Sequence, residues 1–299
     1  MVDEITLSQM LEQARSFVDE RKYLHAAQIY NRLTTLAPSM EAAWVELSHV
    51  YSELNQYDAA ERVLQQASAS TRDPNKILYL LGNLHQKTAA FDRALVSYKK
   101  LLFREKDLSR RLRSHLHFNI AICYFSKGNL RLAETHFRKV KRIDPHFPKI
   151  HESLGELLLR RGAVTESITV LRRAVALDPY SWIGHYLLGL AFAQVREWNQ
   201  AYEEFVSAIE MDPNEPNGWH MCGEALLSLE RYDEAEQYLR KALDLNPHLT
   251  DAIANVGLLY MHRGDMDTAF ECFERALALE PSNRKALEGK EQLVRRIGR

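Results

Sequence analysis

Residues 186–213 read YLLGLAFAQVREWNQAYEEFVSAIEMDP, and residues 220–247, 34 positions later, read HMCGEALLSLERYDEAEQYLRKALDLNP. Both stretches have an apolar residue before a glycine, an alanine twelve positions after that glycine, and a closing proline. Prolines recur at this 34-residue interval five times, at Pro145, Pro179, Pro213, Pro247 and Pro281. A fixed period of this length predicts that one small structural unit is copied along the chain.

Each copy predicts a pair of α-helices. Apolar residues recur three and four positions apart in each half of the copy, which places them on one face of a helix. The proline ends the second helix because it has no amide hydrogen and clashes with the preceding turn. A glycine inside a helix costs about 1 kcal/mol relative to alanine. Gly189 and Gly223 therefore indicate places where another helix approaches the backbone closely.

The pattern resembles that of the tetratricopeptide-repeat family. In that family a bulky residue, Leu-Gly, Tyr, a small residue, an aromatic or Leu, Ala and Pro follow one another in this order. One copy matches with Trp219, Cys222, Gly223, Leu226, Ala235, Leu239, Ala242 and Pro247. The resemblance covers nearly the whole chain and implies an all-α fold, a right-handed α-solenoid of about eight helix pairs plus a C-terminal capping helix. Helix pairs of this size must stack on their neighbours to bury their apolar faces.

Aligned on this pattern, the chain is expected to divide into eight units and a cap. The expected units are about 7–40, 41–74, 75–108, 114–147, 148–181, 182–215, 216–249 and 250–283. The third unit lacks its closing proline and the next begins five residues late, which predicts an insertion near 103–113. Residues 284–299 are expected to form a capping helix with a polar, basic outer face.

Composition points to a protein without a membrane partner. No run of about 18 apolar residues is present, and the first ten residues carry Asp3 and Glu4 but no basic residue, unlike a secretory signal. Three cysteines, Cys123, Cys222 and Cys272, have no metal-ligand spacing and are expected to be free thiols in a reducing compartment. We therefore expect a cytoplasmic location, no metal and no cofactor.

Charge is segregated along the chain although the net charge is only −1. Residues 93–173 contain 19 Lys and Arg against 7 Asp and Glu, whereas residues 178–280 contain 6 against 19. Such blocks either steer charged partners or are the ordinary solvated faces of amphipathic helices.

The family resemblance places partner-binding residues on the first helix of each unit, which lines a concave groove. Transferred position by position, the expected groove residues of the third to sixth repeats are Lys76, Tyr79, Asn83, Lys87, Phe118, Asn119, Ile122, Phe125, Lys149, Arg160, Tyr186 and Leu190. The apolar members would hold apolar side chains of a partner, and the basic members would pair with its acidic groups, as in binding of an extended peptide or an amphipathic helix. Alternatively, the same residues pack against the first helix of the neighbouring unit.

Three histidines, His117, His151 and His185, recur at one position of successive units. Packed helices lie on the order of 10 Å apart, whereas zinc needs ligand nitrogens about 2 Å away. The three histidines therefore cannot share an ion. We expect their imidazoles to take the packing position that Trp44 and Trp219 occupy in other units.

The sequence contains no glycine-rich phosphate loop, nucleophile elbow or paired metal-ligand motif, so we expect no enzymatic activity. The functional hypothesis is a non-catalytic scaffold or adaptor that binds a protein segment in the groove of the third to sixth repeats. Two alternatives stay open. One is nucleic-acid association through the basic block 93–173, and the other is self-assembly that pairs the basic block of one copy with the acidic block of another.

Overall fold

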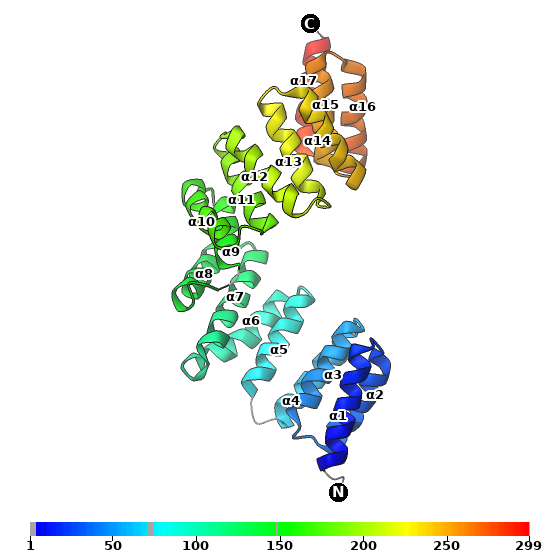
Figure 1. The fold of residues 1–299 in the computed structure, drawn as a ribbon, viewed down its shortest axis with the longest axis vertical. Helices are drawn as coiled ribbons and strands as arrows, with labels where there is room; N and C mark the ends of the chain where they lie inside the picture. The colour runs from blue at the N-terminus through cyan, green and yellow to red at the C-terminus, as the bar shows by residue number, and fades with distance from the viewer. Residues whose placement is uncertain (1–3, 71–73, 148, 299) are drawn as a thin grey trace. The chain divides into compact units, whose positions relative to one another are not determined.

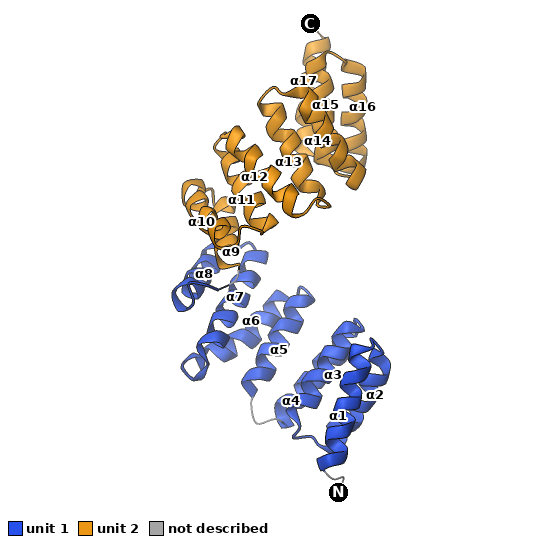
Figure 2. Ribbon diagram, in the orientation of Figure 1, with its two compact units in different colours: residues 1–147 blue, residues 148–299 orange. Residues whose placement is uncertain are grey.

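The computed structural model describes residues 4–70, 74–147 and 149–298, and these residues form seventeen α-helices, one short 3-10 helix and no strand. The chain divides into two compact units, residues 1–147 and residues 148–299 (Figure 2). In each unit consecutive helices pack in pairs, and each pair packs on the next (Figure 1). The all-α repeat solenoid that the sequence predicts is confirmed.

Unit 1 contains four helix pairs. The helices are α1 (Glu4–Asp19), α2 (Tyr23–Leu36), α3 (Glu41–Glu53), α4 (Tyr57–Ser70), α5 (Pro74–Lys87), α6 (Phe91–Leu102), η1 (Glu105–Asp107), α7 (Arg110–Ser126) and α8 (Leu130–Ile143).

Unit 2 contains four further pairs and one additional helix. They are α9 (Ile150–Arg160), α10 (Val164–Leu177), α11 (Trp182–Gln194), α12 (Trp198–Met211), α13 (Pro216–Ser228), α14 (Tyr232–Leu245), α15 (Thr250–Arg263), α16 (Met266–Leu279) and α17 (Arg284–Ile297).

Each glycine of the repeated pattern faces a large side chain of the following helix. A Cβ atom added to Gly189 would lie 2.5 Å from Cε1 of Phe205, and one added to Gly223 would lie 2.6 Å from Cγ of Leu239. These distances are too short for carbon atoms, which pack at roughly 3.5–4.0 Å. The structure therefore confirms that the glycines are required by close approach of the two helices of a pair.

The repeated prolines set the ends of the second helices. Helices α10 and α12 end two residues before Pro179 and Pro213. The intervening Asp178 has φ −134° and ψ 87°, outside the helical region, as expected for a residue before proline. Its Oδ1 atom then accepts a hydrogen bond from the backbone N of Tyr180 at 3.2 Å, which forms the turn into the next helix.

The connection between α6 and α7 carries the irregular segment that the broken period predicts. The helix η1 lies in this connection, and the Oγ atom of Ser109 accepts a hydrogen bond from the backbone N of Leu112 at 3.2 Å, which caps α7. Leu101 and Leu108, on either side of the connection, are buried, whereas Phe103 is exposed.

The outer face of α17 differs from the polar, basic face expected from the sequence. Arg295 and Arg296 are exposed, but so are Leu287, Val294 and Ile297. Leu287 and Val294 occupy the positions that Ile253 and Tyr260 hold 34 residues earlier in α15. In a complete pair such positions face the second helix, and the described residues provide no second helix for α17.

We predict that Gly189→Ala lowers the free energy of unfolding by about 1–3 kcal/mol, because the added methyl group overpacks Phe205. Gly184→Ala, in the same helix, is the matched control. Its added Cβ meets no atom closer than 3.5 Å, so it should leave stability unchanged or raise it by up to about 1 kcal/mol. Equilibrium urea unfolding followed by circular dichroism measures both, and equal stabilities of the two variants would contradict the packing argument.

Candidate partner-binding surface

The first helices of successive pairs form one face in each unit, which we call the first-helix face. In unit 1 it includes α5 and its neighbour α7, which contact each other. In unit 2 the first helices α9 and α11, α13 and α15, and α15 and α17 make the corresponding contacts. All twelve expected groove residues lie on these first helices or, for Lys149, immediately before one.

A polar cluster joins α5, α6 and α7. Nδ2 of Asn119 donates hydrogen bonds to Oδ1 of Asn83 at 2.8 Å and to the Tyr79 hydroxyl at 3.2 Å. The hydroxyl of the fully buried Tyr98 donates to the same Oδ1 atom of Asn83 at 2.7 Å. Burial raises the pKa of Tyr79. Three expected groove residues are thus brought together, and their hydrogen bonds also hold the third and fourth repeats against each other.

Phe118 takes part in internal packing. Its ring centroid lies 5.0 Å from that of Phe147 and 5.6 Å from that of Phe137, both of which are buried. For this residue the structure favours the packing alternative. Ile122 and Phe125, further along α7, are half-buried and keep part of their surface open.

Three of the four basic groove residues already have carboxylate partners. Nζ of Lys76 lies 2.7 Å from Glu41 and Nζ of Lys87 lies 3.7 Å from Glu53, so that α5 is paired with α3. Arg160 pairs with Glu156 of its own helix at 2.9 Å. Lys149 is exposed and has a left-handed φ of 61° at the start of α9. Exposed pairs of this kind contribute about 0–1 kcal/mol, so an incoming carboxylate can exchange with them.

In unit 2 Tyr186 is half-buried between two aromatic rings. Its ring centroid lies 6.1 Å from that of Trp182 and 5.9 Å from that of Phe205. The pKa of Tyr186 is raised to about 12. The main cause is burial, and the negative charge of nearby carboxylates, first that of Glu215, adds to it. Leu190, one helical turn further on, is half-buried in the same apolar cluster.

A second polar cluster, which the sequence did not reveal as a site, joins α13, α15 and α17. Nδ2 of Asn255 lies 2.9 Å from Nε2 of His220, and Nζ of Lys285 donates to Oε2 of Glu224 at 2.6 Å. Burial lowers the pKa of His220 to about 4. Burial alone would raise the pKa of Glu224, but Lys285 outweighs it and the pKa is lowered.

The recurring histidines differ from one another. Nε1 of Trp44 and of Trp219 donates to the carbonyl of the proline six residues earlier, at 2.8 and 2.9 Å. Nε2 of His185 lies 3.2 Å from the equivalent carbonyl of Pro179, which confirms that this imidazole replaces an indole. His117 instead faces His136, with 2.9 Å between their Nδ1 atoms, and Glu105 of η1. Burial lowers the pKa of both histidines, for His136 to about 4.

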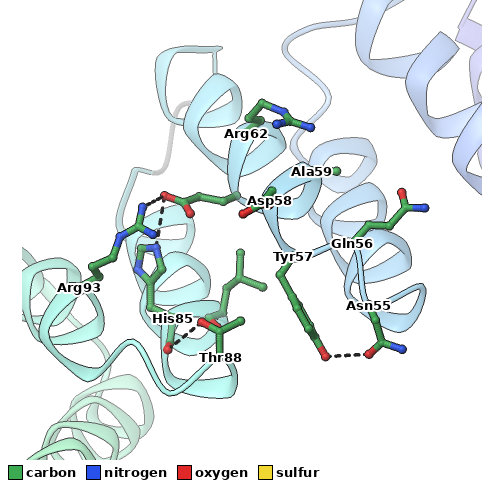
Figure 3. A pocket seen from close by; sticks show the side chains of 11 residues that line it. Asn55, Gln56, Tyr57, Asp58, Ala59, Arg62, His85, Thr88 and Arg93 are labelled. Atoms are coloured by element: carbon green, nitrogen blue, oxygen red, sulfur yellow. Dashed lines mark hydrogen bonds and ion pairs between the residues drawn. The ribbon is translucent and has the colours of Figure 1, made fainter.

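An open cleft of about 580 Å³ lies among α4, α5 and α6 of unit 1 (Figure 3). Arg93 pairs with Glu61, whose Oε1 atom is also 3.3 Å from Nε2 of His85. Neither ring nitrogen of His85 has a hydrogen-bond partner among the described residues. Arg93 neutralises the buried carboxylate, which gives the cleft a structural ion pair at its wall.

Other classes of site find little support in the described parts of the chain. In residues 4–70, 74–147 and 149–298, no three His, Cys, Asp or Glu side chains are grouped so that they could hold a metal ion. None of the helices described there is long and apolar enough to cross a membrane. Cys123, Cys222 and Cys272 are free thiols.

Sequence comparison finds matches to one family along most of the chain. Models described as tetratricopeptide repeat match residues 17–84, 114–147, 144–181, 216–249 and 250–283. A search of curated proteins finds no match.

Solved structures with the same fold include the APC/C hetero-tetramer Cut9-Hcn1. The match has a TM-score of 0.67 at 16% identity and covers 98% of this chain and 57% of that chain, so this chain spans little more than half of its length. A tetratricopeptide repeat protein from Parabacteroides merdae gives a TM-score of 0.65 at 13% identity, covering 85% of this chain and 98% of that one. YrrB, described as a TPR protein with an unusual peptide-binding site, gives 0.51 at 19%, covering 65% and 97%. At these identities the likeness concerns the fold.

We predict that acidification destabilises the protein through its buried histidines. An unfolded imidazole has a pKa near 6.5, so between about pH 6.5 and pH 4 the unfolded chain binds protons that folded His220 and His136 do not. Their contribution to stability is present above this window and is lost as the pH falls through it. Urea midpoints measured at pH 7.5 and pH 5 should therefore differ less in His220→Gln than in the wild type. His248→Gln, at an exposed position, is the control. If both variants reduced the difference between the two urea midpoints equally, the loss of stability could not be assigned to His220.

Proposed function

The chain belongs to the tetratricopeptide-repeat family, and we propose that it acts as a non-catalytic scaffold that binds a segment of another protein on its first-helix faces. The observation that carries this proposal is the set of apolar side chains on first helices that stacking leaves partly open. Ile122 and Phe125 on α7 and Tyr186 and Leu190 on α11 are half-buried. Family membership supports protein binding in general, and on the basis of these residues we propose α7 in unit 1 and α11 in unit 2 as its locations.

The chemistry of these residues favours a partner segment with apolar side chains. In unit 1, Ile122 and Phe125 follow Asn119 on α7, and the amides of Asn119 and Asn83 are only partly buried. Apolar surface beside amide groups suits an extended peptide or an amphipathic helix, which offers apolar anchors together with backbone or polar groups. The amides would then exchange part of their mutual hydrogen bonding for bonds to the partner.

Acidic groups on the partner are a secondary feature of the proposal. Lys76, Lys87 and Arg160 are paired with Glu41, Glu53 and Glu156, so a partner carboxylate would replace an existing pair. The net gain from such an exchange is small at exposed positions. We therefore propose that apolar contacts supply most of the affinity and that the basic residues, including Lys149, contribute orientation and association rate.

The two alternatives from the sequence would use other surfaces. Residues 93–147 carry fourteen Lys and Arg against four Asp and Glu. Exposed members of this set, such as Lys99, Lys100, Lys141 and Arg142, lie on the second helices α6 and α8. Nucleic-acid association and pairing of basic and acidic blocks between copies remain predictions that concern these second helices, not the first-helix faces.

We predict that Ile122→Asp and Leu190→Asp each weaken binding of a peptide partner about tenfold or more, because a charge is placed against apolar side chains of the ligand. A displayed library of random peptides, selected against the full chain, provides the ligand, and fluorescence anisotropy measures its affinity for each variant.

Thr135→Asp on the exposed face of α8 is the matched control, and urea unfolding checks that all three variants remain folded. The proposal would be contradicted if the selected peptides bound Ile122→Asp and Leu190→Asp as tightly as the wild type. It would also be contradicted if Thr135→Asp weakened binding as much as these two variants do.

A further inference from the structure

Phe103, in the connection after α6, is 92% exposed. Its exposure is not shared by the apolar residues around it, since Leu101 and Leu108 are buried. A large aromatic side chain in water forgoes the stabilisation that burial would give. The position of Phe103 therefore calls for an explanation in terms of what it contacts outside this chain.

The connection that carries Phe103 is held in place by specific contacts. Oε1 of Glu105 on η1 lies 3.1 Å from Nε2 of the buried His117, whose Nδ1 atom lies 2.9 Å from that of His136 on α8. Nη1 of Arg104 donates to Oδ1 of Asn75 at 3.4 Å. Anchored on both sides, the segment presents Phe103 outward from a fixed backbone.

The side chains beside Phe103 are basic and lack carboxylate partners. Lys99 and Lys100 lie four and three residues before it, on the same side of α6, and Arg104 and Lys106 follow it. All four are exposed, and none of the four forms an ion pair with a carboxylate of the described residues. Elsewhere in the same block such pairs do form, as between Lys127 and Asp92.

Among the exposed residues from 92 to 107, cationic and apolar side chains outnumber the two carboxylates, Asp92 and Asp107. Val96, two turns before Phe103 on α6, is 56% exposed. From residue 92 to residue 107, no exposed side chain is an amide or a hydroxyl. Phe103 is the one exposed aromatic side chain in this stretch, whereas single-stranded nucleic acid is held largely by stacking of successive bases on several aromatic side chains. The composition instead matches a surface that meets both hydrocarbon and negative charge.

We propose that Val96, Lys99, Lys100, Phe103, Arg104 and Lys106, here called the basic-aromatic surface, dock this protein peripherally on an anionic lipid bilayer. The cations lie against the lipid headgroups and Phe103 enters the boundary between headgroups and acyl chains. No membrane-spanning helix is needed for this mode of binding. It revises the expectation of no membrane partner, which rested on the absence of a long apolar run and a signal segment.

The charge of the surrounding unit reinforces the basic-aromatic surface. Unit 1 contains 22 Lys and Arg against 16 Asp and Glu, and this excess of six positive charges attracts the unit as a whole to a negative surface within a Debye length. Helix α8 adds exposed cations, among them Arg131, Lys141 and Arg142. The proposal uses second helices and the inserted connection, so it is independent of peptide binding on the first-helix faces and can fail or succeed without it.

The test is co-sedimentation of the full chain with vesicles of phosphatidylcholine alone and with vesicles that also contain phosphatidylserine. The wild type should bind the phosphatidylserine vesicles preferentially, and less so as salt is added. Phe103→Ser, and the double variant Lys99→Glu with Lys100→Glu, should each reduce binding about tenfold. Because these side chains are exposed, circular dichroism should show unchanged folding.

Tyr180→Ser is the matched control, since Tyr180 is 80% exposed but lies in unit 2, next to acidic residues such as Asp178. It should bind vesicles like the wild type. The depth to which residue 103 enters the bilayer can be measured with Phe103→Trp. The fluorescence that this tryptophan adds to that of the four native tryptophans should be quenched by lipids with brominated acyl chains.

Three results would overturn the proposal. The first is that the wild type binds phosphatidylserine vesicles no better than phosphatidylcholine vesicles. The second is that Phe103→Ser binds as well as the wild type, and the third is that Tyr180→Ser loses as much vesicle binding as Phe103→Ser. Binding of a single-stranded oligonucleotide that is tighter than vesicle binding and is weakened by Phe103→Ser would assign the surface to nucleic acid instead.

Discussion

Contact between a glycine of each first helix and a large side chain of the following helix governs this structure. Gly189 against Phe205 and Gly257 against Phe273 bring the two helices of a pair closer than any residue with a Cβ atom would allow. That approach buries the aromatic ring completely, as Phe205 and Phe273 show. The close pairing gives each repeat a compact unit that the next pair packs against.

Because pairs stack closely, internal packing and the proposed partner binding compete for the same side chains of the first-helix faces. Phe118 is largely committed to packing, whereas Ile122 and Leu190 keep part of their surface open. The difference follows from the neighbours that each side chain meets, such as the Phe147 ring against Phe118. Under the proposed function, the protein would bind with the residues that internal packing leaves available, and small differences in burial along the regular surface would set its specificity.

Two polar groups that are withdrawn from solvent are paired with side chains from helices outside the regular pairs. The half-buried Glu224 is neutralised by Lys285 of α17, and the buried His117 is surrounded by Glu105 and His136. In both cases an element outside the regular pairs, α17 or η1, provides a partner. These contacts tie α17 to α13 and η1 to α7, and the connection that contains η1 holds Phe103 in its outward position.

The sequence by itself determined the all-α repeat fold, the close approach at the glycines, the proline turns and the role of His185, because each depends on spacing within one or two copies. Tertiary structure alone decided that Lys76 pairs with Glu41, that Lys285 reaches Glu224 across 61 residues, and that Phe103 is exposed. Those contacts arise when one pair stacks on another, and a periodic pattern does not encode which long side chains then meet. The period dictates the backbone, while the surface depends on individual residues brought together by stacking.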